Sequence, residues 1–421
     1  MARSAPSRWL DIVRNNRTMV AIAVATAIAM MGQGVVAPIL PLFAGEMDAS
    51  TTAIGMVVGA FGISRLFLNI PAGLFGERFG RTALMSSGLA VTAAGMAMTG
   101  ASSTIGTMIA WRIVAGAGSA MFMTGAQAYV ADISTPENRG RLMSVQQGAL
   151  LFGVDIGPVM GGIVGDLAGL RWPFFIAGAL SACAAVWTAF RLPNRPAQRV
   201  GSGVASTQVK SGTTTKPTLG GSVTSLLRDP TFLLVGMFTL VIFFTRTGSR
   251  QTLIPLLGAD EFSMTATHLG VLFAMITTIN FFLVGPSGWM SDRFGRKPIM
   301  APGLLLGGVA LVMFAYSPSI VMIFVAGIVL GIGQGIAGPT PAAYIADLAP
   351  AGKTSAAMGL YRTFGDVGFV IGPPLLGLIA DNFSLTAGLN ANAVLIAVVA
   401  FALILFARET AGRRARDRGS G

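Results

Sequence analysis

The sequence of 421 residues contains a single cysteine and a single histidine, and this scarcity excludes several functional classes. One thiol, Cys183, cannot form an internal disulfide or a thiolate metal site. With His268 as the lone imidazole, no Ser/His/Asp set, metal-ligand cluster or phosphate-binding loop is available. We therefore expect a protein that is not an enzyme and has no cofactor, in which both residues are structural.

Charged residues are also scarce, at 11% of the sequence against 53% hydrophobic residues, and the mean hydropathy is +0.70. A globular protein of this composition would be insoluble in water, whereas a lipid bilayer solvates such a surface directly. The alternating pattern of membrane β-strands is absent, and the 55 glycines suit membrane helices that approach closely. The sequence predicts an all-α integral membrane fold that has the bilayer as its partner.

The net charge of +12 could indicate a nucleic-acid-binding protein, so the placement of the 29 basic residues decides the matter. If both ends of a twelve-span chain are inside, most basic residues lie in cytoplasmic segments and Arg171 alone lies outside. This asymmetry follows the positive-inside rule and predicts cytoplasmic termini and no nucleic-acid partner. The predicted spans cover residues 19–43, 53–75, 83–101, 105–131, 142–166, 173–191, 230–256, 267–290, 298–316, 320–347, 356–381 and 388–407.

A nine-residue stretch occurs twice, at residues 73–81 and 288–296, each time between two membrane-length runs. The offset of 215 residues also superimposes glycines, tyrosines and aspartates from the second to the fifth span of each half. We therefore predict a duplicated bundle. Its segments are a cytoplasmic tail (1–18), a six-helix bundle (19–191), a Ser/Thr/Gly/Pro-rich cytoplasmic linker (192–229), a second six-helix bundle (230–407) and a cytoplasmic tail (408–421).

Polar side chains within the spans indicate a central cavity, because an arginine in hydrocarbon costs about 2.5 kcal/mol or more. Arg65 and Asn69 share one helical face, and Gln33 between two glycines, with prolines beyond, predicts a broken first helix that lines the cavity. For Arg246 and Arg250, a cavity role and snorkelling to the membrane interface are both open. The predicted cavity residues are Gln33, Arg65, Asn69, Gln147, Arg246, Arg250, Asn280, Gln334 and Tyr361.

The repeated stretch resembles the loop between the second and third helices of the major facilitator superfamily. The second copy matches the family pattern through Lys297, whereas the first has Glu77 in place of aspartate and Thr82 in place of a basic residue. The resemblance covers essentially the whole chain and implies two six-helix halves that rock about a central cavity. It also implies that an acid ending the second helix faces the N-terminus of the eleventh, while Arg81 or Arg78 pairs with Asp132. The implied gating residues are Gly73, Glu77, Arg78, Arg81, Asp132, Gly288, Asp292, Arg293, Arg296 and Asp347.

Two further motifs resemble those of proton-driven exporters in this superfamily. Arg112 with Gly116 and Gly118 is similar to a fourth-helix motif associated with proton coupling. Residues 153–162 resemble the fifth-helix motif of drug:proton antiporters, with Ser144 in place of its upstream glycine. The helix-packing residues predicted in the two halves are Gly153, Gly157, Pro158, Gly161, Gly162, Gly372 and Pro373.

A proton antiporter needs a carboxylate that binds a proton from one side of the membrane and releases it to the other. Asp155 and Asp366 are the acids placed deep enough, and Asp366 can pair with Arg362 one helical turn away, so Asp155 is the favoured coupling residue. The predicted proton-coupling residues are Asp155, Arg112, Asp366 and Arg362. The alternative, in which both acids only neutralise arginines, stays open.

The sequence thus predicts a secondary active transporter with alternating access, whose leading function is proton-coupled efflux of drugs or amphipathic metabolites. Five arginines within spans against two aspartates favour instead the uptake or exchange of an anionic solute or lipid-like substrate. A sensor or structural membrane protein is the alternative from another class. We expect a monomer in the cytoplasmic membrane of a bacterium, with a small-molecule substrate and protons as the coupling ion.

Overall fold

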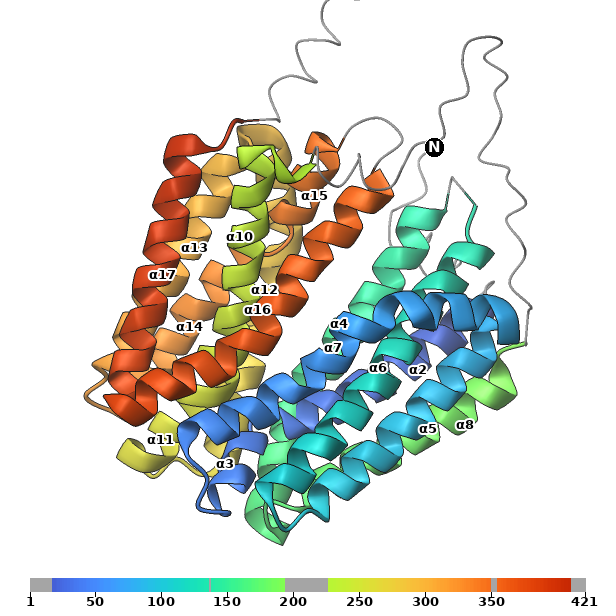
Figure 1. The fold of residues 1–421 in the computed structure, drawn as a ribbon, viewed down its shortest axis with the longest axis horizontal. Coiled ribbons are helices and arrows are strands. Elements are labelled where there is room, and N and C mark those ends of the chain that lie inside the picture. The colour runs from blue at the N-terminus through green and yellow to red at the C-terminus, as the bar shows by residue number, and fades with distance from the viewer. Residues whose placement is uncertain (1–16, 136–137, 194–225, 350–353, 410–421) are drawn as a thin grey trace, which may run out of the picture. The chain divides into compact units, whose positions relative to one another are not determined.

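The computed structural model describes residues 17–135, 138–193, 226–349 and 354–409, which form helices and connecting turns with no β-strand among them (Figure 1). The helices before the linker are α2 (Arg17–Val36), α3 (Leu40–Gly45), α4 (Thr51–Phe79), α5 (Arg81–Gly100), α6 (Ile105–Ile133), α7 (Arg139–Ala168) and α8 (Trp172–Arg191). Those after it are α10 (Pro230–Phe244), η1 (Thr245–Leu253), α11 (Ile254–Phe262), α12 (Ala266–Phe294), α13 (Lys297–Ala315), α14 (Ile320–Ala337), α15 (Thr340–Leu348), α16 (Thr354–Asn382) and α17 (Leu385–Phe406).

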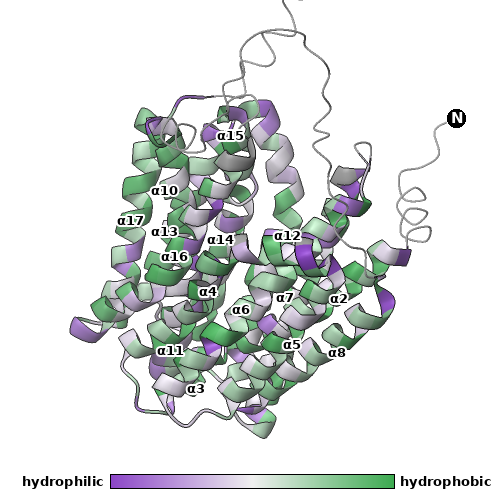
Figure 2. Ribbon diagram, turned by 45° about the vertical axis from the view of Figure 1, so that its right-hand side comes forward, coloured by the Kyte–Doolittle hydropathy of each residue, from purple (hydrophilic) through white to green (hydrophobic). Residues whose placement is uncertain are grey.

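Within these described ranges, 12 helical segments are long and apolar enough to cross a membrane. Figure 2 shows hydrophobic residues over most of the helix lengths, with much of the hydrophilic colour near helix ends and loops. Each predicted span overlaps one of the observed segments. The predicted all-α membrane fold is confirmed.

Three spans are interrupted where the α-helical hydrogen-bonding pattern stops. The chain between α2 and α3 contains Pro38, which has no amide hydrogen to donate, and this is the break predicted beyond Gln33. A second break, between α14 and α15, falls at Gly338 and Pro339. The third is η1, a nine-residue π-helical stretch that the sequence pattern did not predict.

The described residues form two compact units. The first takes residues 17–40 and 63–193, and the second takes 41–62 and 226–409. Between the two units along the chain, α8 ends at Arg191 and α10 begins at Pro230. Most of the predicted linker and most of both tails lie outside the described residues. That residues 41–62 pack with the second unit was not predicted from the sequence.

Both units use glycines at equivalent repeat positions to bring helices together. In the first unit, a Cβ at Gly88 on α5 would lie 2.7 Å from the carbonyl oxygen of Gly118 on α6. In the second, a Cβ at Gly333 on α14 would lie 2.8 Å from the carbonyl oxygen of Gly303 on α13. Such distances leave no room for a side chain, so close packing through small residues explains these glycines. The duplication therefore extends from the sequence to the helix packing.

Residues 51–62 of α4 pack against α16 within the second unit. A Cβ at Gly55 would overlap the carbonyl oxygen of Pro373, and one at Gly59 would lie 2.6 Å from that of Val370. At the end of this contact, the carboxylate of Asp381 accepts hydrogen bonds from the first turn of α4. Backbone lies against backbone along this contact, because glycines recur about one helical turn apart.

Candidate functional site

The arginine that ends each copy of the repeated stretch forms an equivalent ion pair with an aspartate on a later helix. Arg81 donates from Nε to Asp132 Oδ2 at 3.2 Å, and Arg296 donates from Nε to Asp347 Oδ2 at 3.3 Å. The predicted partner of Asp132 is therefore Arg81. The other candidate, Arg78, is exposed, and its guanidinium carbon lies 5.4 Å from the centroid of the neighbouring Phe79 ring.

The glycine before each paired arginine adopts a conformation that side chains disfavour. Gly80 has a φ of 96° and Gly295 has a φ of 108°, in the region that residues with a Cβ rarely adopt. Each glycine therefore lets the chain turn sharply between one span and the next. In the second copy Asp292 also accepts a hydrogen bond from Arg296.

Some of the predicted gating contacts lie outside the described residues. The side-chain surroundings of Gly73 and Glu77 are not described. The predicted contact of Glu77 with the N-terminus of the eleventh span therefore stays a prediction. A Cβ at Gly288 would meet no atom within 4 Å. Arg293 lies with its guanidinium carbon 5.3 Å from the Trp289 ring centroid.

Arg112 is buried in the first unit at 7% exposure. It donates from Nη1 to the sulfur of Met96 on α5 at 3.8 Å, and sulfur is a weak acceptor. Two helical turns further along α6, Ser119 accepts a hydrogen bond at 2.9 Å from Gln33 on α2. The predicted cavity residue Gln33 thus contacts α6, the helix that carries the predicted coupling residue Arg112. Neither Met96 nor Ser119 was predicted from the sequence, because a methionine and a serine within apolar spans carry no distinctive signal.

The glycines around Asp155 pack α7 directly onto the backbone of α2. A Cβ at Gly153 would overlap the carbonyl oxygen of Ala27, and one at Gly157 would lie 2.6 Å from that of Met31. Gly161 meets the carbonyl oxygen of Val35 in the same way. Asp155 is half-buried in the middle of this stretch. We call the contact between residues 153–161 and α2 the α2/α7 seam.

The second unit repeats this seam between α16 and α10, with glycines at the equivalent positions. A Cβ at Gly368 would overlap the carbonyl oxygen of Leu240, and one at Gly372 would lie 2.8 Å from that of Phe244. Pro373 packs against α4 instead, through the contact with Gly55. The packing expected of Gly157 and Gly372 is therefore observed in both halves of the repeat.

Arg250 lies in the interior of the second unit, where it is 6% exposed. It donates from Nη2 to the carbonyl oxygen of Phe273 on α12 at 3.2 Å and from Nη1 to the amide oxygen of Gln334 on α14 at 3.4 Å. The guanidinium carbon also lies 5.1 Å from the Phe273 ring centroid. Snorkelling to the membrane interface is therefore wrong for Arg250, because the side chain is buried and two of its nitrogens donate hydrogen bonds to neighbouring helices. Arg246, on the same π-helix, is half-buried.

The π-helix η1 is joined to α17 by a buried asparagine that was not predicted from the sequence. Asn392, 1% exposed, donates to the hydroxyl of Ser249 at 2.6 Å and accepts from the hydroxyl of Thr245 at 3.2 Å. Inside η1, the hydroxyl of Thr252 donates to the carbonyl oxygen of Thr247 at 2.9 Å. Two features of the sequence could have indicated this contact. One is the run of polar residues from Thr245 to Thr252, and the other is an asparagine within an otherwise apolar span.

The remaining predicted residues are divided between the two units. Asp366 is buried at 9% exposure, whereas Arg362 is exposed, and their pairing stays a prediction. Gln147 is exposed, and the side chain of Asn69 lies outside the described residues. The half-buried members are Arg65, Arg246, Asn280, Gln334 and Tyr361.

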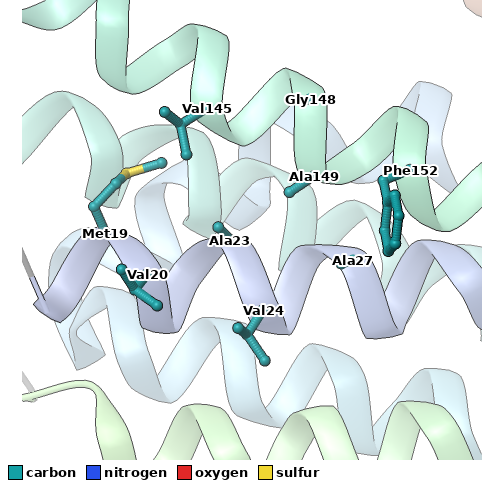
Figure 3. A pocket seen from close by; sticks show the side chains of 9 residues that line it. All are labelled: Met19, Val20, Ala23, Val24, Ala27, Val145, Gly148, Ala149 and Phe152. Carbon is teal, nitrogen blue, oxygen red and sulfur yellow. The ribbon is translucent and has the colours of Figure 1, made fainter. Parts of the chain in front are cut away.

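An apolar groove opens between α2 and α7 in the first unit (Figure 3). Its volume is about 380 Å³, and ligand pockets span roughly 300–1,000 Å³. Figure 3 shows Met19 and Val145 at one end and Ala27 and Phe152 at the other, so the two helices run in the same direction along it. The sequence analysis did not predict this α2/α7 groove. It is lined by Met19, Val20, Ala23, Val24, Ala27, Val145, Gly148, Ala149 and Phe152.

A family model described as Major Facilitator Superfamily matches residues 22–285 and 239–421. The chain belongs to the major facilitator superfamily. The family and the fold are those of multi-pass membrane transporters, which are not enzymes.

Several known transporters resemble the chain. Multidrug resistance protein 1 of Bacillus subtilis (strain 168) is 25% identical over 382 residues, which cover 87% of this chain and 91% of that protein. The solved structure of the nucleoside transporter NupG has a TM-score of 0.73 at 15% identity and covers 92% of this chain and 98% of its own. The human organic anion transporter MFSD10 has a TM-score of 0.63 at 16% identity, with coverages of 92% and 99%. The multidrug resistance relative supports the resemblance to drug:proton antiporters, whereas the structural neighbours share the fold.

Proposed function

We propose that this transporter exports drugs or amphipathic metabolites in exchange for protons, by alternating access. The observation that carries the proposal is the α2/α7 seam, in which Gly153 and Gly157 bring α7 against the backbone of α2 with the half-buried Asp155 between them. A tightly packed seam transmits a change at one helix to the other, because packed helices shift as units. The similarity to Multidrug resistance protein 1 supports the choice of substrate class.

In this proposal Asp155 is the group that carries the proton. A carboxylate within a span can take up a proton while the substrate leaves and release it on the other side of the membrane. Arg112, buried in the same unit, is the basic residue of the proposed coupling. Protonation and substrate binding would then alternate. Asp366, buried in the second unit, is the other acid available for this role.

Transport in proteoliposomes with an imposed pH gradient tests the proposal. We expect Asp155→Asn to abolish accumulation of a fluorescent lipophilic cation driven by the gradient while leaving substrate exchange without a gradient intact. Asp48→Asn is the matched control, because Asp48 is exposed and its φ of 52° suits asparagine equally well. Gradient-driven transport at the original rate in Asp155→Asn would remove this residue from the coupling mechanism.

Exchange or uptake of an anionic solute is the second candidate. It is favoured by two buried guanidinium groups, Arg112 in the first unit and Arg250 in the second, because buried positive charges attract anions. Counterflow in inverted vesicles distinguishes the two functions. Faster counterflow of an anionic amphiphile than of a lipophilic cation, lost in Arg250→Gln, would favour the second candidate over drug export.

The setting of this activity is part of the proposal. The excess of basic residues in segments predicted as cytoplasmic supports an orientation with both termini in the cytoplasm, in the cytoplasmic membrane of a bacterium. We propose a monomer, since each half of the duplicated chain supplies one of the two parts that alternating access requires.

A further inference from the structure

The α2/α7 groove exists because small residues leave space between the side chains of two neighbouring helices. Ala23 and Ala27 on α2 lie opposite Gly148 and Ala149 on α7. A Cβ at Gly148 would meet no atom within 4 Å, so this position faces open space. All nine lining residues are apolar or glycine. The groove therefore offers no side-chain hydrogen bond and suits hydrocarbon.

Two arginines stand at the same end of this groove. Arg17 begins the stripe on α2 that continues through Val20, Val24 and Ala27, at i+3, i+7 and i+10. Arg141 begins the stripe on α7 that continues through Val145, Gly148 and Phe152, at i+4, i+7 and i+11. Both arginines are exposed. The two helices run in the same direction from Met19 and Val145 (Figure 3). Since Arg17 and Arg141 precede those two residues in the sequence, both positive charges belong to that end of the groove.

We propose that the α2/α7 groove binds one acyl chain of an anionic phospholipid, whose phosphate lies between Arg17 and Arg141. From Met19 to Ala27 the chain takes eight helical steps along α2, or roughly 12 Å at about 1.5 Å per residue. This length takes a large part of one acyl chain, with the headgroup left at the end where the charges are. The proposal does not depend on which substrate is transported or in which direction.

Charge and polarity favour a phospholipid over the other possible occupants. A drug with several polar atoms would leave them without hydrogen bonds in a groove lined only by hydrocarbon, which costs free energy. A zwitterionic lipid would fill the groove but gain less from two arginines. An anionic lipid satisfies both features, and the bilayer supplies it at high local concentration.

Photolabelling of the full-length protein in nanodiscs tests the site directly. The probe is phosphatidylglycerol with a diazirine in the middle of one acyl chain, and its phosphatidylcholine equivalent is the comparison. We expect the phosphatidylglycerol label on peptides covering residues 19–27 and 145–152, and several-fold less label there from phosphatidylcholine. Labelling spread evenly over the lipid-facing helices would overturn the proposal. Label on these peptides from a diazirine analogue of a transported drug, but not from the lipid, would overturn it too.

Variants test the contributions of the acyl chain and the headgroup to binding separately, with bound lipid measured by native mass spectrometry. Gly148→Leu should fill the groove and remove the bound phosphatidylglycerol, whereas Gly106→Leu, at another open helical glycine in the first turn of α6, should not. Arg17→Gln and Arg141→Gln should each weaken binding about fivefold, as expected for one surface arginine against an anionic lipid. Arg228→Gln, an exposed arginine before α10, should have no effect.

Each result of these measurements decides the proposal. Size-exclusion and circular dichroism profiles that match the parent protein establish that Gly148→Leu is folded, and bound lipid unchanged in that folded variant would exclude the groove. Equal retention of phosphatidylglycerol and phosphatidylcholine by the parent protein would exclude the role of the two arginines.

Discussion

Asp381 and Thr52 join the last turn of α16 to the first turn of α4. The carboxylate of Asp381 accepts hydrogen bonds from the amide of Thr52 at 2.9 Å, from its hydroxyl at 2.6 Å, and from the amide of Thr51 at 2.7 Å. Amides in the first turn of a helix have no partner within that helix. Asp381 thus caps a helix that is more than 300 residues away in the sequence, and its negative charge lies at the positive end of that helix.

Removing the charge of Asp381 should loosen this contact. Asp381→Asn keeps the shape but replaces one accepting oxygen with a donating amide, which cannot satisfy a backbone amide of α4. We expect a loss of about 0.5–2 kcal/mol, the range for helix caps, measured as a lower midpoint of thermal unfolding. Asp260→Asn, at an exposed position on α11, is the control and should leave the midpoint unchanged. Equal midpoints for the two variants would contradict the capping role.

The contact of Gly55 with Pro373, next to this cap, should leave no room for any side chain at position 55. Gly55→Ala places a methyl group on the carbonyl oxygen of Pro373, and since both are backbone-fixed, α4 and α16 must separate. Overpacking of this kind costs about 1–3 kcal/mol. Gly45→Ala adds the same methyl group where nothing lies within 4 Å and should be neutral. The fraction of protein that stays folded after heating in detergent checks both variants. An unchanged folded fraction in Gly55→Ala would show that the two helices adjust easily to the added methyl group.

The ion pair between Arg81 and Asp132 should contribute more to the free energy of unfolding than the exposed Arg78 does. Arg81→Gln removes a charge-assisted hydrogen bond to Asp132 and should cost about 1.5–3 kcal/mol, whereas Arg78→Gln should cost much less. A double-mutant cycle of Arg81→Gln with Asp132→Asn measures the coupling free energy directly. Additive effects of the two substitutions would show that the pair contributes nothing. The same cycle at Arg296 and Asp347 should give a similar value, because the two pairs have the same geometry.

Asn392 should be essential to the π-helical stretch. Asn392→Leu leaves the hydroxyls of Thr245 and Ser249 buried without the partner they have now, at a cost of about 1–3 kcal/mol for each unsatisfied group. Asn390 lies on the same helix as Asn392 and donates an exposed hydrogen bond to Tyr316. Asn390→Leu removes this bond and should change stability little. Hydrogen exchange at residues 245–253 checks the prediction, with faster exchange expected in Asn392→Leu alone. Unchanged exchange there would show that η1 forms independently of α17.

The placement of Arg250 and Arg81 shows where sequence reasoning stopped. The sequence placed Arg250 near the outer part of a span and left two roles open, and the interior position was decided by the Phe273 carbonyl and the Gln334 amide on two other helices. It also offered two partners for Asp132. Only the turn at Gly80 brings Arg81, and not Arg78, within hydrogen-bonding distance.

The sequence by itself determined the twelve spans, the duplication and the break near Pro38, because hydropathy, repeat register and a missing amide hydrogen are properties of the chain that need no partner. The tertiary structure decided the position of residues 41–62 in the second unit, the network around Asn392 and the α2/α7 groove. These features depend on which helix faces meet. A contact made by backbone carbonyls, or a space left between alanines and glycines, leaves no distinctive side chain for a sequence to display.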